Sequence, residues 1–338
     1  MKRIYVSIFI ASIILCACSG NAVSPPSRAE VSDRNSDGSD AVDFAEGEKS
    51  KKDQAEGETD NSETSEAEEP NTENEAAKAK EETMGTYSVK DCEFTRDGMK
   101  IYGKLYVPDG QGPYPAVILG HGFGADLSMM QGYADSLAKH GYIAYPFDFI
   151  GGGANVKSDG KLTEMSVLTE AADMSAVLDG IKMLDVVDSD NVILLGASQG
   201  GFVATYVAGK RPDDIKGLIA LYPAYVLQDD SRKRTDNGKN ILDTFSVMDV
   251  TIGRKYDEDA LSFDIYDVMK DYTGDAYIIH GTSDSVVPYS YSIRAAETMP
   301  DAELVPIEGA GHVFFGKDDE YATELILSHL DKLCGRGQ

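Results

Sequence analysis

The chain has 338 residues and a formal net charge of −27. Residues 84–338 alone carry a net charge of −17, which argues against nucleic acid and against an anionic membrane surface as binding partners. Composition changes along the chain, from an apolar start through a polar acidic stretch to an ordinary globular mixture from about Tyr87 onward. This change favours one large domain with N-terminal additions over two small domains.

The first residues are typical of an export signal. Two basic residues precede the apolar run Ile4–Leu15, which is short for a membrane span. The following letters "LCACSG" resemble a bacterial lipobox. The resemblance implies that residues 1–17 are a lipoprotein signal peptide, removed by cleavage just before Cys18, and that the sulfur of Cys18 carries diacylglycerol. We therefore expect an exported protein, lipid-anchored to the outer face of a bacterial membrane on the cell surface or periplasmic side. An ordinary signal peptide or a short membrane anchor is the alternative.

Residues 18–83 are predicted to be the lipidated cysteine and a disordered acidic linker. The stretch 21–83 holds 19 acidic and 7 basic residues and very few large apolar ones. Such a segment cannot bury enough apolar surface to offset the entropy of its chain. We expect it to be a solvated tether for a domain that covers 84–338.

The main domain begins with extended segments, and a turn at "RDG" predicts a hairpin. Short apolar runs then alternate with helical patterns, which predicts an α/β fold with a mostly parallel sheet covered by helices on both faces. The predicted core strands are 116–120, 142–148, 191–196, 217–222, 276–281 and 302–309, and the predicted helices lie within 129–141, 166–184 and about 319–332.

One connection is much longer than the others. Residues 223–273 separate two predicted core strands, whereas most such connections have only a few residues. We expect an inserted cap there, with helical pieces around 240–251 and 257–271. Elsewhere in the domain, Cys92 and Cys334 lack the spacing of a zinc site, and whether they form a disulfide is left open.

Ser198 lies in "GASQG", which follows a predicted strand and opens a predicted helix. A sharp strand-to-helix turn leaves no room for side chains at Gly196 and Gly200, and it lifts the serine Oγ above the edge of the sheet. This short pattern also arises by chance, so a nucleophilic serine needs support from other residues.

A serine nucleophile needs a base, and the chain has five histidines. His140 ends a helix, His329 is expected near the surface of the last helix, His280 closes a strand and is expected to pack, and His121 follows a strand. His312 lies in a glycine-rich loop after the last strand, from which its side chain can reach across the sheet edge. Position alone favours His312.

The third member must be an acid that orients the imidazole and stabilises its positive form. Asp284 follows a strand in "IIHGTSDSVVP", whereas Asp148 ends a strand upstream of the serine. The order serine, acid, histidine along the chain favours Asp284. We expect Asp148 to order its own loop in "DFIGGG".

Two backbone N–H groups are candidates for an oxyanion site. In "LGHGFGAD" the glycines at 122 and 124 let the chain turn so that the N–H of Phe123 points into the site. The N–H of Gln199 lies just after the serine, at a helix N-terminus whose dipole favours negative charge.

The motifs "HGFG", "GASQGG", "HGTSDSVVP" and "GAGH" occur in this order at the ends of four strands, and they resemble the α/β-hydrolase superfamily. The stretch "DFIGGGANVKSDGKLTEMSVLTE" resembles the bacterial cinnamoyl and feruloyl esterases, which also carry an inserted cap. The resemblance covers 87–334 and implies Ser198 as nucleophile, His312 as base, Asp284 as acid, and Phe123 and Gln199 as oxyanion donors.

Two departures from that family bear on the substrate more than on the reaction. Ala197 stands where those esterases usually carry a histidine before the serine. The glycines at 151–153 stand where they have a histidine between two glycines.

The expected function is a serine carboxylesterase that hydrolyses neutral esters, hydroxycinnamoyl esters among them, through an acyl-enzyme. The substrate would be a small-molecule or saccharide-linked ester, and no metal or organic cofactor is implied. A serine peptidase of the acylaminoacyl or dipeptidyl type and an inactive binding lipoprotein are the alternatives. Four cap rings are expected either to hold a planar aromatic acid or to form a small core of the cap itself: Tyr225, Phe245, Phe263 and Tyr266.

Overall fold

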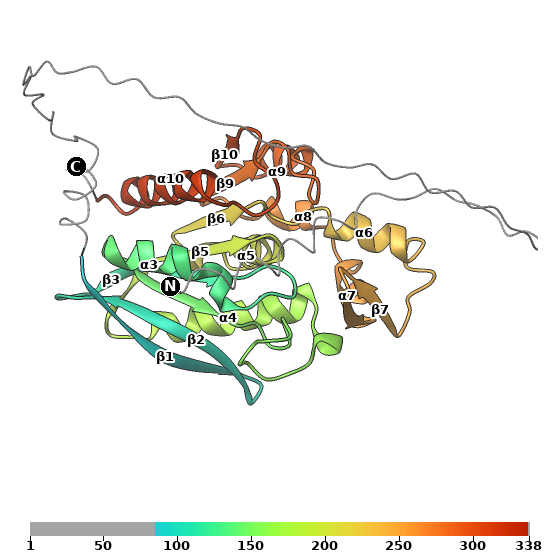
Figure 1. Cartoon of the computed structure of the whole chain (residues 1–338), viewed down its shortest axis with the longest axis horizontal. Coiled ribbons are helices and arrows are strands. Elements are labelled where there is room, and N and C mark those ends of the chain that lie inside the picture. The colour runs from blue at the N-terminus through green and yellow to red at the C-terminus, as the bar shows by residue number, and fades with distance from the viewer. Residues whose placement is uncertain (1–84, 337–338) are drawn as a thin grey trace, which may run out of the picture. The chain divides into compact units, whose positions relative to one another are not determined.

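The computed structural model describes residues 85–336, which belong to the compact unit Glu75–Gln338 (Figure 1). The predicted signal peptide, the lipidated Cys18 and the acidic linker to residue 83 lie outside the described residues. Within 85–336, no helix combines the length and the hydropathy that a membrane span would need.

An eight-stranded sheet forms the centre of the domain, with strand order β1-β2-β4-β3-β5-β6-β9-β10. β1 runs antiparallel to β2, and β2 runs antiparallel to β4. The other six strands of this sheet, β4, β3, β5, β6, β9 and β10, are parallel, as predicted. The strands are β1 (Tyr87–Arg96), β2 (Met99–Pro108), β3 (Tyr114–Gly120), β4 (Ile143–Phe147), β5 (Val187–Ala197), β6 (Gly217–Leu221), β9 (Asp275–Gly281) and β10 (Ala302–Ile307).

The hairpin expected at "RDG" is present between β1 and β2. Asp97 and Gly98 both have positive φ, 53° and 78°. Two-residue hairpin turns with positive φ at both positions match the right-handed twist of the strands, and an Asp-Gly pair adopts them readily.

Helices cover both faces of the sheet (Figure 1). α3 (Gln131–Lys139) and α10 (Lys317–Leu333) pack on one face, and α4 (Val167–Lys182), α5 (Gln199–Lys210) and α9 (Ser290–Thr298) pack on the other. Side chains of β3 alternate between the two layers, with Ile118 facing one and Val117 and Leu119 facing the other. Because both faces are buried, the strands read as continuous apolar runs. Short 3₁₀ turns lie at Leu127–Met130, Leu162–Glu164 and Pro212–Asp214.

The inserted cap follows β6. The prediction of a helix around 240–251 in this cap is wrong. That stretch is a hairpin, in which Phe245 and Ile252 face each other and the turn residues Met248 and Asp249 have positive φ. Apolar and polar residues alternate along both strands, which is the period of a half-buried sheet. The cap elements are α6 (Leu227–Arg234), β7 (Thr244–Val247), β8 (Val250–Gly253), α7 (Lys255–Ala260) and α8 (Ile265–Met269), so the second expected helix is split in two.

His329 and the two cysteines of the domain were also the subject of predictions. His329 was expected near the surface but is buried, with its Nε2 2.6 Å from Asp275 Oδ1 and its ring stacked on Tyr277 at 3.9 Å. A carboxylate partner and an aromatic face make this position suitable for a buried imidazole. Cys92 and Cys334 are free thiols.

Candidate active site

Ser198 occupies the tight turn between β5 and α5. Its φ of 53° is unusual for a serine, and such strain is often found at functional sites. A Cβ on Gly196 would lie 2.1 Å from the carbonyl oxygen of Gly200, and one on Gly200 would lie 2.4 Å from that of Gly120. The expectation that only glycine fits at these two positions is confirmed.

The structure brings the three predicted side chains into one hydrogen-bonded row. His312 Nε2 lies 3.0 Å from Ser198 Oγ, and His312 Nδ1 lies 2.7 Å from Asp284 Oδ2. The residues follow the ends of β5, β9 and β10, so their convergence depends on the strand order of the sheet. In this arrangement the imidazole can take the serine proton while the carboxylate fixes its tautomer.

Asp284 has an environment that keeps it ionised. Its Oδ1 accepts the backbone N–H groups of Val286 and Val287, both at 2.8 Å, and its Oδ2 faces His312 and His280. Burial opposes ionisation, but the hydrogen bonds from His280 and His312 outweigh it and hold the pKa of Asp284 well below its usual range. A charged carboxylate can therefore stabilise the imidazolium that forms when the serine loses its proton.

His280 was expected only to pack, yet it also binds the acid. Its Nε2 lies 3.0 Å from Asp284 Oδ2 and 3.1 Å from the carbonyl oxygen of Val287, while its Nδ1 lies 2.6 Å from Ser292 Oγ. A carbonyl only accepts, so Nε2 carries the proton and the serine hydroxyl donates to Nδ1. The position of His280 four residues before the acid was the signal that could have indicated this contact.

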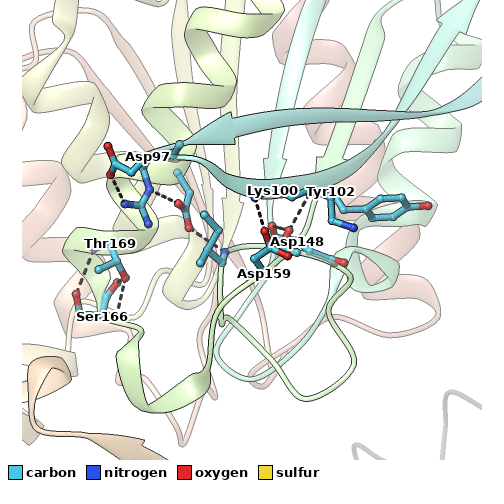
Figure 2. A network of polar contacts seen from close by, with 11 residues as sticks. Asp97, Lys100, Tyr102, Asp148, Asp159, Ser166 and Thr169 are labelled. Carbon is cyan, nitrogen blue, oxygen red and sulfur yellow. Dashed lines mark hydrogen bonds and ion pairs between the residues drawn. The ribbon is translucent and has the colours of Figure 1, made fainter.

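Asp148, the alternative acid, is used by its own loop (Figure 2). Its Oδ1 accepts the N–H of Leu127 and its Oδ2 accepts the N–H of Lys157, each at 2.7 Å. Figure 2 shows the same loop fixed to β2 through a second carboxylate, as Asp159 accepts the N–H of Lys100 at 2.7 Å. The interpretation that Asp148 orders the chain around it is confirmed.

The "HGFG" loop lies against the nucleophile. A Cβ on Gly122 would be 3.3 Å from Ser198 Cβ, and Gly124 has a φ of 67°. His121 is buried and holds the loop, since its Nδ1–H donates to the carbonyl of Gly122 at 2.8 Å and its Nε2 accepts the N–H of Phe149 at 3.2 Å. Gly122, the residue before Phe123, therefore packs directly against Ser198.

The second candidate donor is the N–H of Gln199, the first residue of α5. The first N–H groups of a helix have no acceptor within the helix and are available to an anion. The two predicted oxyanion residues thus come from separate segments of the chain: Gln199 directly follows Ser198, and Phe123 directly follows Gly122, which packs against Ser198.

The glycines at 151–153 explain one departure from the esterase pattern. Gly153 pairs with Gly124 as an isolated bridge, and a Cβ there would lie 2.0 Å from the carbonyl oxygen of Ala125. A Cβ on Gly152 would be 2.8 Å from Phe149 Cβ. The backbone packs too closely against the "HGFG" loop to accept a side chain.

Tyr222 is a neighbour of the base that sequence reasoning missed. Its ring meets the His312 ring edge-on at 5.0 Å and is almost fully buried. Such a contact restricts the imidazole to one orientation. Tyr222 directly follows β6 at the same sheet edge as Ser198, which was the available signal.

Three of the four cap rings that were expected to hold an aromatic acid pack against other residues of the protein, which was the alternative expected for them. Tyr225 is buried, with its hydroxyl 2.8 Å from Thr205 Oγ1. Phe263 packs on Tyr206, and Tyr266 lies under the guanidinium of Arg294. These rings form the interior between the cap and the sheet-covering helices. Phe245 also lies under a guanidinium, that of Arg234, but its ring centroid is 6.5 Å from that of Tyr256, whose hydroxyl donates to Gln199 beside the serine.

The strand order, the serine turn and the convergence of side chains at the carboxyl edge of a mostly parallel sheet define a class of protein: the chain has the α/β-hydrolase fold. A family model described as serine aminopeptidase, S33, matches residues 111–248. The matched part contains Ser198 and ends before Asp284 and His312.

Known proteins resemble the domain over different lengths. The structure of Est1E from Butyrivibrio proteoclasticus with ferulic acid bound is 27% identical, has a TM-score of 0.67, and covers 72% of this chain and 100% of its own. A putative carbamate hydrolase, RutD, from Stutzerimonas stutzeri is 28% identical over 35% of this chain and 44% of its own length. A putative esterase/lipase 2 from Mycoplasma genitalium is 33% identical over 37% and 42%, respectively.

The chain spans about half the length of the curated relatives it matches. Hydrolases, among them an esterase/lipase, recur in these similarities, and the solved structure at 27% identity holds ferulic acid.

Proposed function

We propose that the protein is a serine carboxylesterase with Ser198 as nucleophile, His312 as general base and Asp284 as the orienting acid. The observation that carries this proposal is the unbroken row of hydrogen bonds from Ser198 Oγ through both nitrogens of His312 to Asp284 Oδ2. Each side chain has the partner that its proposed role requires.

The reaction would proceed through an acyl-enzyme. Ser198 Oγ attacks the ester carbonyl carbon while its proton moves to His312 Nε2, and the N–H groups of Phe123 and Gln199 donate hydrogen bonds to the oxyanion. The intermediate expels the alcohol, which takes the proton from His312. Water then gives a proton to His312 and attacks the acyl carbon, and the acid leaves as Ser198 regains its proton.

For the substrate, we propose neutral carboxylic esters, with hydroxycinnamoyl esters among them. The solved structure at 27% identity holds ferulic acid, and the present chain has an insertion between β6 and β9, as the resemblance to the cinnamoyl and feruloyl esterases implies. Phe123, Tyr256 and Phe245 form a row of rings from the "HGFG" loop into the cap, with centroids 5.8 and 6.5 Å apart. The net charge of −17 over 84–338 disfavours anionic substrates.

The test compares kcat/KM for methyl ferulate, a short p-nitrophenyl ester and an aminoacyl-p-nitroanilide. The esterase proposal expects both esters to be cleaved faster than the anilide, and it expects Ser198→Ala to lower kcat for the esters by on the order of 10⁵–10⁶. A peptidase remains the second candidate because the matched family model is described as a serine aminopeptidase. A higher kcat/KM for the anilide than for methyl ferulate would favour that candidate instead.

For the location, we propose that the mature protein is exported and held at the outer face of a bacterial membrane by lipid on Cys18. The "LCACSG" motif and the apolar run before it support this proposal.

A further inference from the structure

The side chain of Gln199 is held from two sides. It is almost fully buried, its Oε1 accepts the hydroxyl of Tyr256 at 2.7 Å, and its Nε2 donates to Glu170 Oε2 at 2.8 Å. Tyr256 belongs to α7 in the cap, and Glu170 belongs to α4 beneath it. The amide therefore joins the cap to the helices of the sheet directly beside the nucleophile.

Glu170 is a rigid support for this amide. It is buried in the first turn of α4, whose start is fixed by reciprocal hydrogen bonds between Ser166 and Thr169 (Figure 2). Burial raises the pKa of Glu170 well above its ordinary value. Burial therefore favours the neutral carboxyl over the carboxylate at the residue that accepts the hydrogen bond from Gln199.

Tyr256 also contacts Phe123, whose N–H group is the other proposed oxyanion donor. Its ring meets the ring of Phe123 edge-on, with centroids 5.8 Å apart and an angle of 71° between the planes. The same ring packs against Phe245 of the cap hairpin, and the tyrosine is buried. Figure 1 shows α7 and β7 side by side at the end of the domain that carries the cap.

We propose that Tyr256 is a positioning residue for the oxyanion site, acting through Gln199 by its hydroxyl and through Phe123 by its ring. This inference rests on the proposed function, because it takes the N–H groups of Gln199 and Phe123 as the two oxyanion donors. One cap residue thus sets the relative position of two backbone N–H donors, one at the start of α5 and the other in the "HGFG" loop. The cap contributes to the rate of the reaction as well as to the choice of substrate.

The expected size of the effect follows from what is lost. Removal of one oxyanion donor costs on the order of 10²–10³ in kcat, and a displacement of about 1 Å can cost up to 10². Tyr256→Phe keeps the ring and both backbone N–H groups but leaves Gln199 Oε1 buried without its donor. We expect a loss of about 10-fold in kcat and a change in KM of less than about 3-fold, because the donors act mainly in the transition state.

Tyr225→Phe is a matched control. Tyr225 is a buried tyrosine of the 223–273 insertion whose hydroxyl also has one buried partner, Thr205, but it touches neither Gln199 nor Phe123. We expect it to lower the unfolding temperature about as much as Tyr256→Phe while kcat stays within about 2-fold of wild type. A boronic acid that forms a tetrahedral adduct on Ser198 should lose about 10-fold in affinity in Tyr256→Phe and almost nothing in Tyr225→Phe.

A second pair of variants approaches the amide from the opposite side and leaves the cap unchanged. Glu170→Leu removes the oxygen acceptor of Gln199 Nε2, while the weaker contact to Met165 Sδ at 3.6 Å remains, and should reproduce the loss in kcat and in boronic acid affinity. Glu170→Gln keeps an oxygen that can accept the same bond, so it should recover most of that loss. This pair decides the question if Tyr256→Phe fails to fold.

The outcomes separate this inference from the proposed function. Equal kcat and equal boronic acid affinity in wild type, Tyr256→Phe and Glu170→Leu, with ester turnover that still depends on Ser198, would overturn the positioning role alone. Absence of ester turnover in the wild type, or full turnover in Ser198→Ala, would overturn the proposed function itself.

Discussion

Asp284 and Asp148 both follow parallel strands, but their surroundings give them different tasks. Asp284 faces two imidazoles and two backbone N–H groups, and its pKa is lowered in spite of burial. Asp148 faces backbone N–H groups of two loops, and burial raises its pKa. The first environment suits a carboxylate that must stay charged beside a base, and the second suits a loop anchor.

Substitution by asparagine should separate the two roles. Asp284→Asn is expected to lower kcat by about 10⁴, because the amide can favour the wrong tautomer of His312. Asp148→Asn should keep kcat but cost about 1–3 kcal/mol in the free energy of unfolding, since one backbone N–H loses its buried acceptor. Kinetics and urea unfolding of both variants check this, and an inactive Asp148→Asn beside a near-normal Asp284→Asn would reverse the assignment.

His280 shares Oδ2 of Asp284 with the proposed base His312, so its substitution tests how much this second imidazole supports the acid. His280→Leu is expected to lower kcat, because the acid loses one of the donors that keep its carboxylate charged and in place. The acid limb of the pH profile of kcat/KM should also move to higher pH. An unchanged profile together with a lowered unfolding temperature would show that His280 only packs.

Glu170 should affect stability in a pH-dependent way. Its pKa is raised in the folded protein by burial, so between about pH 4.3, the ordinary value for glutamate, and the raised value the folded state binds more protons than the unfolded chain. The stability contributed by the neutral acid is fully present below about pH 4.3 and is lost as the pH rises. Glu170→Gln removes this dependence. Urea unfolding at pH 5, 6, 7 and 8 should show the wild type losing stability relative to the variant as pH rises, whereas a constant difference would contradict the raised pKa.

At the scale of the elements, the parts of the fold that repeat one local pattern could be predicted. The core strands, the long helices and the serine turn follow from apolar runs, 3.6-residue spacing and glycines at positions without room for a Cβ. The role of Tyr256 could not be predicted this way. Its partner Gln199 is 57 residues away in the sequence, and nothing local to either residue indicates the contact.

The cap hairpin shows a different limit of local reasoning. Phe245 and Ile252 alternate with polar neighbours over only four residues in each strand, which is too short to distinguish a strand from an amphipathic helix. The turn residues Met248 and Asp249 give no strong hairpin signal, because Asn-Gly is the preferred pair at such positions.

Redesign of that turn tests the hairpin. Met248→Asn with Asp249→Gly should stabilise the protein by about 1 kcal/mol, since both positions have positive φ, which a methionine adopts at a cost. In the helix first expected at 240–251, the same glycine would destabilise by about 1 kcal/mol. Thermal unfolding gives the sign of the change. A stabilised double variant supports the hairpin, and a destabilised one supports the helix.

At the scale of the whole molecule, every proposed catalytic and oxyanion residue lies within the part of the chain that the structure describes, 85–336. The proposed tether at 21–83 contributes none of them. Its deletion should therefore leave kcat and KM for a soluble ester within about 2-fold of wild type, as measured on purified protein. A large loss of kcat would show that the acidic stretch takes part in catalysis or folding.

The two cysteines of "LCACSG" provide a matched pair of variants that test the proposed lipid anchor. Cys18→Ser removes the proposed acceptor of diacylglycerol, whereas Cys16→Ser changes a residue that leaves with the signal peptide. One acyl chain binds a membrane only marginally, but the two chains of a diacylglyceryl group hold a protein stably. We therefore expect wild type and Cys16→Ser in the membrane fraction, and Cys18→Ser either released or retained as an uncleaved precursor. Mass spectrometry of the mature N-terminus measures the modification directly, and an unmodified Cys18 in a cleaved protein would refute the lipid anchor while leaving the esterase proposal intact.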